Sequence, residues 1–215
     1  MPGSSSTTWT AAYTRQVAEN IRHHRRRQGL SVQNVADRCA AQGLPLERNN
    51  LAKLESGHRA SLTVAELLVL ARALNTPPVL LLTPLGRSTE SVEILPGVDA
   101  DPGEAVFWLD GTAPLPDTPY EEGAGARAEL QALRTHRLLV GEWTARARAA
   151  AEARGRANDE TEPLPEAWRE AAHGHAEQAA HAAERIGHLR DNMRLRGLPL
   201  PDLPPGLIHL DLWPE

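Results

Sequence analysis

The chain has 215 residues but a single cysteine, Cys39, so it cannot form an intramolecular disulfide bond. A lone cysteine is typical of proteins from a reducing compartment. No apolar run approaches the roughly 18 residues of a membrane-spanning helix, and residues 1–9 lack the basic-then-apolar pattern of a secretory signal. These absences predict a cytoplasmic protein that does not enter a membrane.

The sequence also lacks the motifs of several enzyme classes. It contains no nucleophile elbow, no glycine turn for an oxyanion and no phosphate loop of the Walker type. Four histidines on a predicted C-terminal helix have no i, i+4 pairing and no cysteine nearby, so an exposed helix face explains them better than a metal site. They are His173, His175, His181 and His188. We therefore expect no enzymatic activity, no cofactor and no metal.

Charge is present in quantity, but it is unevenly distributed along the chain, whose formal net charge is -5. Up to Gly86, ten Lys and Arg residues face five Asp and Glu residues; beyond Gly86, thirteen face twenty-three. This asymmetry predicts a basic N-terminal part that can bind nucleic acid and an acidic remainder suited to other interactions.

Hydrophobic spacing predicts five short helices in the N-terminal part, after residues 1–8, which are expected to be disordered. Ser31 can cap the second helix, Thr63 and Glu66 form a capping box for the fourth, and Pro77 suits the first turn of the fifth. The expected helices cover residues 11–28, 32–43, 47–56, 63–74 and 77–82.

Beyond residue 84 the sequence becomes rich in alanine, proline and glycine. Alternating residues predict a strand over 91–95, and two alanine-rich helices are expected over 126–154 and 165–196 as antiparallel neighbours. A final strand is expected over 207–211. Because an isolated strand is unstable, we expect it to pair with 91–95, within the chain or across a dimer.

The segment from Leu46 to Gly57 is the most informative part of the sequence. It predicts a short helix that ends at a glycine, with Leu51 and Leu54 on its inner face. Arg and Asn side chains can form paired hydrogen bonds with guanine and adenine edges in the major groove. We therefore expect the outer face of this helix to contact DNA bases, through Arg48, Asn49, Asn50 and Lys53.

A longer pattern surrounds this helix. It comprises Ile21, Arg22, Arg25, Gly29–Ser31, Val35–Arg38, Leu51, Lys53–Glu55, Gly57, Arg59 and Leu67–Leu74. The pattern resembles the lambda-repressor-like, or XRE, family of helix-turn-helix regulators. The resemblance implies a five-helix fold whose second and third helices bind an operator as a dimer. The long loop 40–46, the ending at Pro84 and the segment 92–97 look like an actinobacterial subgroup.

The resemblance also implies an ion pair between Arg25 and Glu55 that locks the first helix to the third. Val32 stands where many members of the family have a glutamine, so that contact moves to Gln33. We expect contacts to DNA phosphates, with an ordinary solvated surface as the alternative, from Arg22, Arg26, Gln33, His58 and Arg59.

The predicted fold is mainly α. The flexible N-terminus and the start of the first helix occupy residues 1–13, and a five-helix helix-turn-helix domain covers 14–84. A linker with a short strand and a loop occupies 85–125. A helical region for dimerisation or regulation covers 126–215 and contains the two long helices with one or two short strands.

The predicted function is a sequence-specific transcriptional regulator, a repressor, that binds a palindromic site in double-stranded DNA as a homodimer. Such a protein works in the cytoplasm, associated with the nucleoid, and its C-terminal region is where an unknown protein or small-molecule effector would bind. The alternative is an adaptor or antitoxin-like protein whose C-terminal helices bind another protein, with DNA binding secondary.

Overall fold

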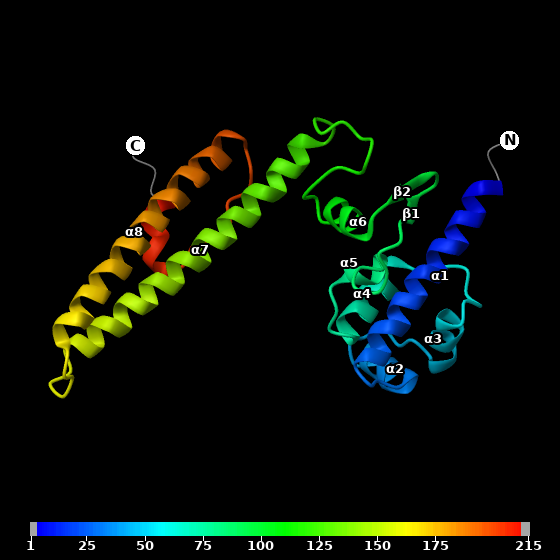
Figure 1. Cartoon of the computed structure of the whole chain (residues 1–215), viewed down its shortest axis with the longest axis horizontal. Helices are drawn as coiled ribbons and strands as arrows, with labels where there is room; N and C mark the ends of the chain where they lie inside the picture. Colours follow the sequence, from blue (N-terminus) through cyan, green and yellow to red (C-terminus); the bar gives the residue numbers. More distant parts are fainter. Residues whose placement is uncertain (1–3, 212–215) are drawn as a thin grey trace. The chain divides into compact units, whose positions relative to one another are not determined.

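The computed structural model describes residues 4–211, with side chains from Thr8 onward (Figure 1). The chain forms two compact units, Met1–Gly123 and Ala124–Glu215, called here the N-terminal and C-terminal units. The described residues are mainly helical, and they include one small antiparallel sheet. Within residues 4–211, no helix combines the length and the apolarity needed to cross a membrane.

The N-terminal unit begins with five helices, as the hydrophobic spacing predicts. They are α1 (Ser4–Arg27), α2 (Val32–Ala40), α3 (Arg48–Glu55), α4 (Val64–Ala73) and α5 (Pro78–Leu82). Capping boxes start α2 at Ser31 and α4 at Thr63, so the local signals for both helix starts are confirmed. The helices enclose one apolar core, whose most deeply buried members are Ile21, Val35, Leu51, Leu54, Leu70, Leu74 and Leu81.

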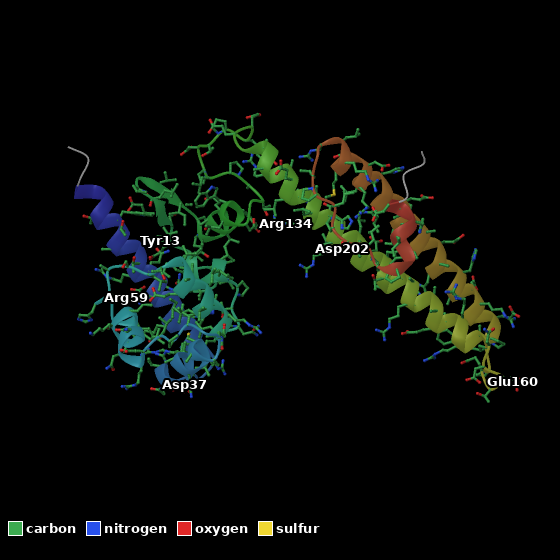
Figure 2. The ribbon with its side chains drawn as sticks, turned by 180° about the vertical axis from the view of Figure 1, so that it is seen from behind. Tyr13, Asp37, Arg59, Arg134, Glu160 and Asp202 are labelled. Atoms are coloured by element: carbon green, nitrogen blue, oxygen red, sulfur yellow. The ribbon has the colours of Figure 1, made fainter. Side chains whose placement is uncertain are left out.

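The first helix begins earlier than the sequence predicts, at Ser4 instead of residue 11. Two aromatic side chains explain the extension. Trp9 stacks on Tyr13 with ring centroids 5.4 Å apart, and the indole Nε1 donates a hydrogen bond to the carbonyl of Glu93 at 2.9 Å. Tyr13, labelled in Figure 2, also donates to the carbonyl of Leu82 at the end of α5, so this part of α1 is tied both to α5 and to β1.

A hairpin and a further helix complete the N-terminal unit. The elements are β1 (Val92–Leu95), β2 (Val98–Ala100) and α6 (Pro102–Leu109). β1 pairs with β2, so the predicted pairing of 91–95 with the C-terminal segment is wrong. Gly97 at φ 77° allows the tight turn between them. The buried side chains of Ile94, Ala100, Ala105 and Leu115 form a small second cluster, so the segment predicted as a linker folds within this unit.

The C-terminal unit is a pair of long helices with a short helical segment packed on them (Figure 1). Its elements are α7 (Ala124–Ala157), α8 (Pro165–Leu195) and the 3₁₀ helix η1 (Pro205–Asp211). The long helices are confirmed, but the predicted strand over 207–211 is wrong. Leu207 and Leu210 are three residues apart, the repeat of a 3₁₀ turn, and both pack in the cluster around Leu139 and Ile186.

The division into units also changes where the acidic residues lie. Residues 87–123, inside the N-terminal unit, carry nine Asp and Glu residues against one basic residue, Arg87. The C-terminal unit is nearly balanced, with fourteen acidic and twelve basic residues. The negative charge expected of the whole C-terminal half therefore belongs mainly to the hairpin, α6 and the loop after it.

Candidate nucleic-acid interface

The outer face of α3 is a polar surface of four exposed side chains. Its inner residues, Leu51 and Leu54, are buried in the core of the N-terminal unit. In the described part of the chain, no hydrogen bond or ion pair engages the side chains on the opposite face. These exposed side chains are Arg48, Asn49, Asn50 and Lys53. They are therefore free to donate and accept hydrogen bonds to a ligand without breaking contacts within the protein.

An ion pair fixes the C-terminal end of α3 against α1. Arg25 Nε and Nη2 each donate to one carboxylate oxygen of Glu55 at 2.7 Å, and Nη1 donates to the carbonyl of Leu30 at 2.7 Å. The two side chains are only 11% and 7% exposed. The hydrogen bond to Glu55 raises the pKa of Arg25 above its usual value, although burial acts against it. The guanidinium thus joins α1, the turn before α2, and α3.

The residues after α3 form a glycine-terminated helix end. Gly57, at φ 74°, donates its amide to the carbonyl of Leu54, and the amide of His58 donates to the carbonyl of Lys53. This is the Schellman arrangement, which satisfies the last carbonyls of a helix. His58 is exposed, with its Nδ1 2.9 Å from the hydroxyl of Ser56. It therefore lies directly beyond the end of α3, open to solvent.

Arg59 has a partner within the chain that the sequence pattern does not predict. Its Nη2 lies 2.7 and 2.8 Å from the two carboxylate oxygens of Glu66, the residue that also closes the capping box of α4. Burial raises the pKa of Glu66, but hydrogen bonds from Thr63 and Arg59 outweigh it, and the net pKa is lowered. The signal in the sequence was the acidic capping residue itself, which binds a nearby cation as well as the helix start.

The remaining expected phosphate contacts lie on two other helices. Gln33 is exposed in the first turn of α2, and its side-chain amide donates to Asp37 at 2.7 Å. Arg22 and Arg26 are exposed on α1, where they line a pocket of about 470 Å³ that contains no residue of α2 or α3. Gln33, His58 and the α3 surface thus lie on α2, on α3 and directly after α3, whereas Arg22 and Arg26 lie on α1.

The structure offers no metal centre within residues 4–211, because no three His, Cys, Asp or Glu side chains there come together in a way that could hold an ion. His173 instead lies 3.2 Å from Glu177 on the exposed face of α8. In comparisons with known proteins, no family model matches the chain, and neither a curated protein nor a solved structure matches it.

Proposed function

We propose that the N-terminal unit binds double-stranded DNA and reads its sequence with α3, in the manner of an XRE-type transcriptional repressor. The observation that carries this proposal is the α3 surface of Arg48, Asn49, Asn50 and Lys53, exposed and without internal partners. An exposed polar helix face is by itself common. Here, however, the same helix is anchored by a buried ion pair and two buried leucines, which hold its outer face rigid.

Base reading follows from the chemistry of these side chains. Arg48 can donate two hydrogen bonds to O6 and N7 of guanine, and Asn49 can bond both N6 and N7 of adenine. Both residues lie in the first turn of α3, the end that enters the major groove in helix-turn-helix proteins. Gln33 and His58 then contact phosphates on either side, which fixes the register without reading sequence. Arg59 serves the fold first, through Glu66.

The mechanism requires no chemical step, because occupancy of an operator blocks the polymerase. One recognition helix reads only a few base pairs, so we propose that two copies bind a palindrome whose half-sites are about 34–36 Å apart. The C-terminal unit supplies the dimer contact. Leu130, Leu133 and Leu138 on α7 support this assignment, since all three are exposed and Leu138 is 72% exposed.

A second candidate function is binding of a protein or small-molecule effector by the C-terminal unit. A pocket of about 500 Å³ between α7 and α8 supports it, with Trp143, Leu207 and Leu210 among its apolar lining and alanines on both helices. In an adaptor or antitoxin-like protein this pocket would be the main site and DNA binding would be secondary. Copurification of a stoichiometric protein that covers this pocket would favour the second function.

Selection of bound fragments from a random DNA pool tests the first function. We expect one enriched motif with two half-sites, and Arg48→Ala to lower affinity for it by about 1–3 kcal/mol while relaxing the preference at one base pair. Affinity for unselected DNA should fall much less. Arg72→Ala is the matched control, because it removes an exposed positive charge from α4. The absence of any enriched motif would contradict the proposal.

A further inference from the structure

The N-terminal unit has a second basic feature, which the α3 surface does not explain. A pocket of about 470 Å³ opens on α1 and on the connection after α5. We call it the α1 pocket. It is lined by Glu19, Arg22, His23, Arg26, Arg27 and Arg87. Four arginines and a histidine therefore surround a hollow that contains a single carboxylate.

This concentration of positive charge works against the stability of the fold. Arg22 and Arg26 are four residues apart on α1, a spacing at which like charges repel. The one carboxylate, Glu19, is already 3.3 Å from Arg87. The helix dipole favours cations in the last turn of α1, which accounts for Arg26 and Arg27. It does not account for Arg87, which comes from another part of the chain.

Arg87 is held in place by a buried residue. Its Nε donates to Asn20 Oδ1 at 3.0 Å, and Asn20 Nδ2 donates to the carbonyl of Leu81 at 3.0 Å. Asn20 is only 2% exposed, so this support is part of the core. A guanidinium fixed in this way loses little further freedom when it binds a phosphate or carboxylate with its remaining donors. The α1 pocket therefore contains one preorganised guanidinium beside three further exposed arginines.

The α1 pocket lies beside the side of α1 that holds α3, and not on it. Arg25 marks that side, because it binds Glu55. Successive residues of an α-helix are about 100° apart, so Arg22 and Arg26 lie about 60° and 100° around the axis from Arg25, and His23 and Arg27 lie about 160° from it. The pocket also contains no residue from α2 or α3. The pocket is thus built without the α3 surface, and the duplex measurement described below tests whether DNA on α3 also occupies it.

We infer that the α1 pocket binds the phosphate groups of a small oligophosphate ligand, at a site separate from the DNA-reading surface. Arginine forks match phosphate oxygens in charge and in geometry. The pocket volume of about 470 Å³ falls within the range of about 300–1,000 Å³ for small-molecule sites. On this assignment Arg22 and Arg26 bind the phosphate groups of this ligand and not those of the DNA operator. The inference goes beyond the proposed DNA binding and does not depend on it.

Titration calorimetry of the full-length protein with inorganic triphosphate tests the site. We expect saturable binding that weakens at least about tenfold in the double variant Arg22→Gln and Arg26→Gln, since two charge-assisted contacts are lost. Glu19→Gln should tighten binding by about threefold or more, because it removes the only repelling charge. Arg72→Gln, on α4, should leave the affinity unchanged. Equal binding by the wild type and the double variant, or no saturable binding, would overturn the inference.

A second arm separates this site from the DNA surface, with an unselected duplex of about 20 base pairs as the probe. The double variant should keep its affinity for the duplex within about threefold, while Arg48→Ala should keep wild-type triphosphate binding. Parallel losses of triphosphate and duplex binding in the double variant would make the pocket part of the DNA interface and would overturn the separate site. Loss of DNA selection alone would leave the inference standing.

Discussion

Both units bury an arginine beside a carboxylate, yet the two arginines are built into the fold differently. In the N-terminal unit, the Arg25 side chain is 11% exposed and binds Glu55 and one carbonyl. In the C-terminal unit, the Arg190 side chain is 2% exposed. Its Nη1 donates to His136 Nε2 at 2.8 Å and to the carbonyl of Pro201 at 2.7 Å, and it forms an ion pair with Asp211. Arg25 thus reinforces the apolar core of the N-terminal unit, whereas Arg190 is itself part of the core of the C-terminal unit.

The difference follows from what each unit can bury. The helices of the N-terminal unit meet through leucine, isoleucine and valine side chains, so Arg25 joins elements that already pack together. Much of the buried surface of α7 and α8 is alanine, which removes little apolar area from water per residue. Only a small cluster around Leu139, Ile186 and Leu207 holds η1. Arg190 therefore helps to hold η1 against α7 and α8, a role that apolar side chains fill in the N-terminal unit.

The largest expected effect comes from breaking the Arg190 cluster. Arg190→Ala leaves His136 Nε2 and the carbonyl of Pro201 without their donor, whereas Asp211 keeps Arg194 at 3.0 Å. An acceptor left without its donor in the interior costs about 1–3 kcal/mol, so the loss of both should cost several kcal/mol. Hydrogen exchange of the full-length protein should show lost protection in α7, α8 and η1, with α1 to α5 unaffected. Arg185→Ala, one turn earlier on α8 and exposed, is the matched control. Equal protection in the two variants would refute the structural role of Arg190.

A smaller effect is expected from the corresponding change in the N-terminal unit. Glu55→Ala should cost about 3 kcal/mol, at the lower end of the range for buried pairs, because Arg25 keeps its bond to Leu30. The lost protection should appear in α1 and α3. Glu55→Gln retains one acceptor and should recover part of the loss. Stability of Glu55→Ala close to that of the wild type would mean that the apolar core alone fixes α3.

The two units also differ in how much of them could be predicted from sequence. Local signals were sufficient for the helix starts at Ser31 and Thr63, because a cap and its N3 partner lie within four residues. The Arg25–Glu55 contact is predicted by the family resemblance and by the position of both residues beside apolar core residues. The DNA-contacting role of the α3 side chains remains a prediction, since their exposure is compatible with it but does not test it.

The C-terminal unit is harder to predict from sequence, because the contacts that determine its structure join residues far apart in the chain. Leu207 and Leu210 fit a strand by alternation and a 3₁₀ turn by spacing, and only their packing on α7 and α8 decides between them. The sequence position of Arg190 is nevertheless informative. It lies on the apolar stripe of α8, four residues after Ile186 and three before Met193. A charged residue on such a stripe needs a buried partner, which here comes from α7 and η1.

Lower pH should weaken the C-terminal unit through His136. Burial first, and then the charge of Arg190, lower the pKa of His136 below its ordinary value of 6.5. Because an arginine can only donate, neutral His136 must accept at Nε2. The unfolded chain therefore takes up the proton at higher pH than the folded one. The stabilisation is complete above about pH 6.5 and is lost as the pH falls through the lowered pKa.

Hydrogen exchange of α7 and α8 across this pH range, corrected for intrinsic rates, measures the effect. His136→Gln keeps a side-chain oxygen that can accept from Arg190 but removes the titration, so its pH dependence should be weaker than that of the wild type. The N-terminal unit provides an internal comparison. Burial also lowers the pKa of His24, so the stability of that unit should likewise fall as the pH is lowered. A wild-type and a His136→Gln protein with identical pH profiles would exclude His136 as the cause.

The smallest effect is expected from a second ion pair between the same two helices. Arg185 Nη1 lies 3.3 Å from Glu142 Oε2, so like Arg190 it links α8 to α7, but the two side chains are 48% and 43% exposed. Water already solvates both groups, and an exposed pair contributes at most about 0.5–1 kcal/mol, which salt reduces further. A double-mutant cycle of Arg185→Ala and Glu142→Ala should therefore give a coupling energy well below the Arg190→Ala cost. A coupling energy of the Arg185–Glu142 pair as large as the Arg190→Ala cost would contradict this expectation. Burial would then not explain why Arg190 stabilises the unit, and its position along α8 would have to explain it.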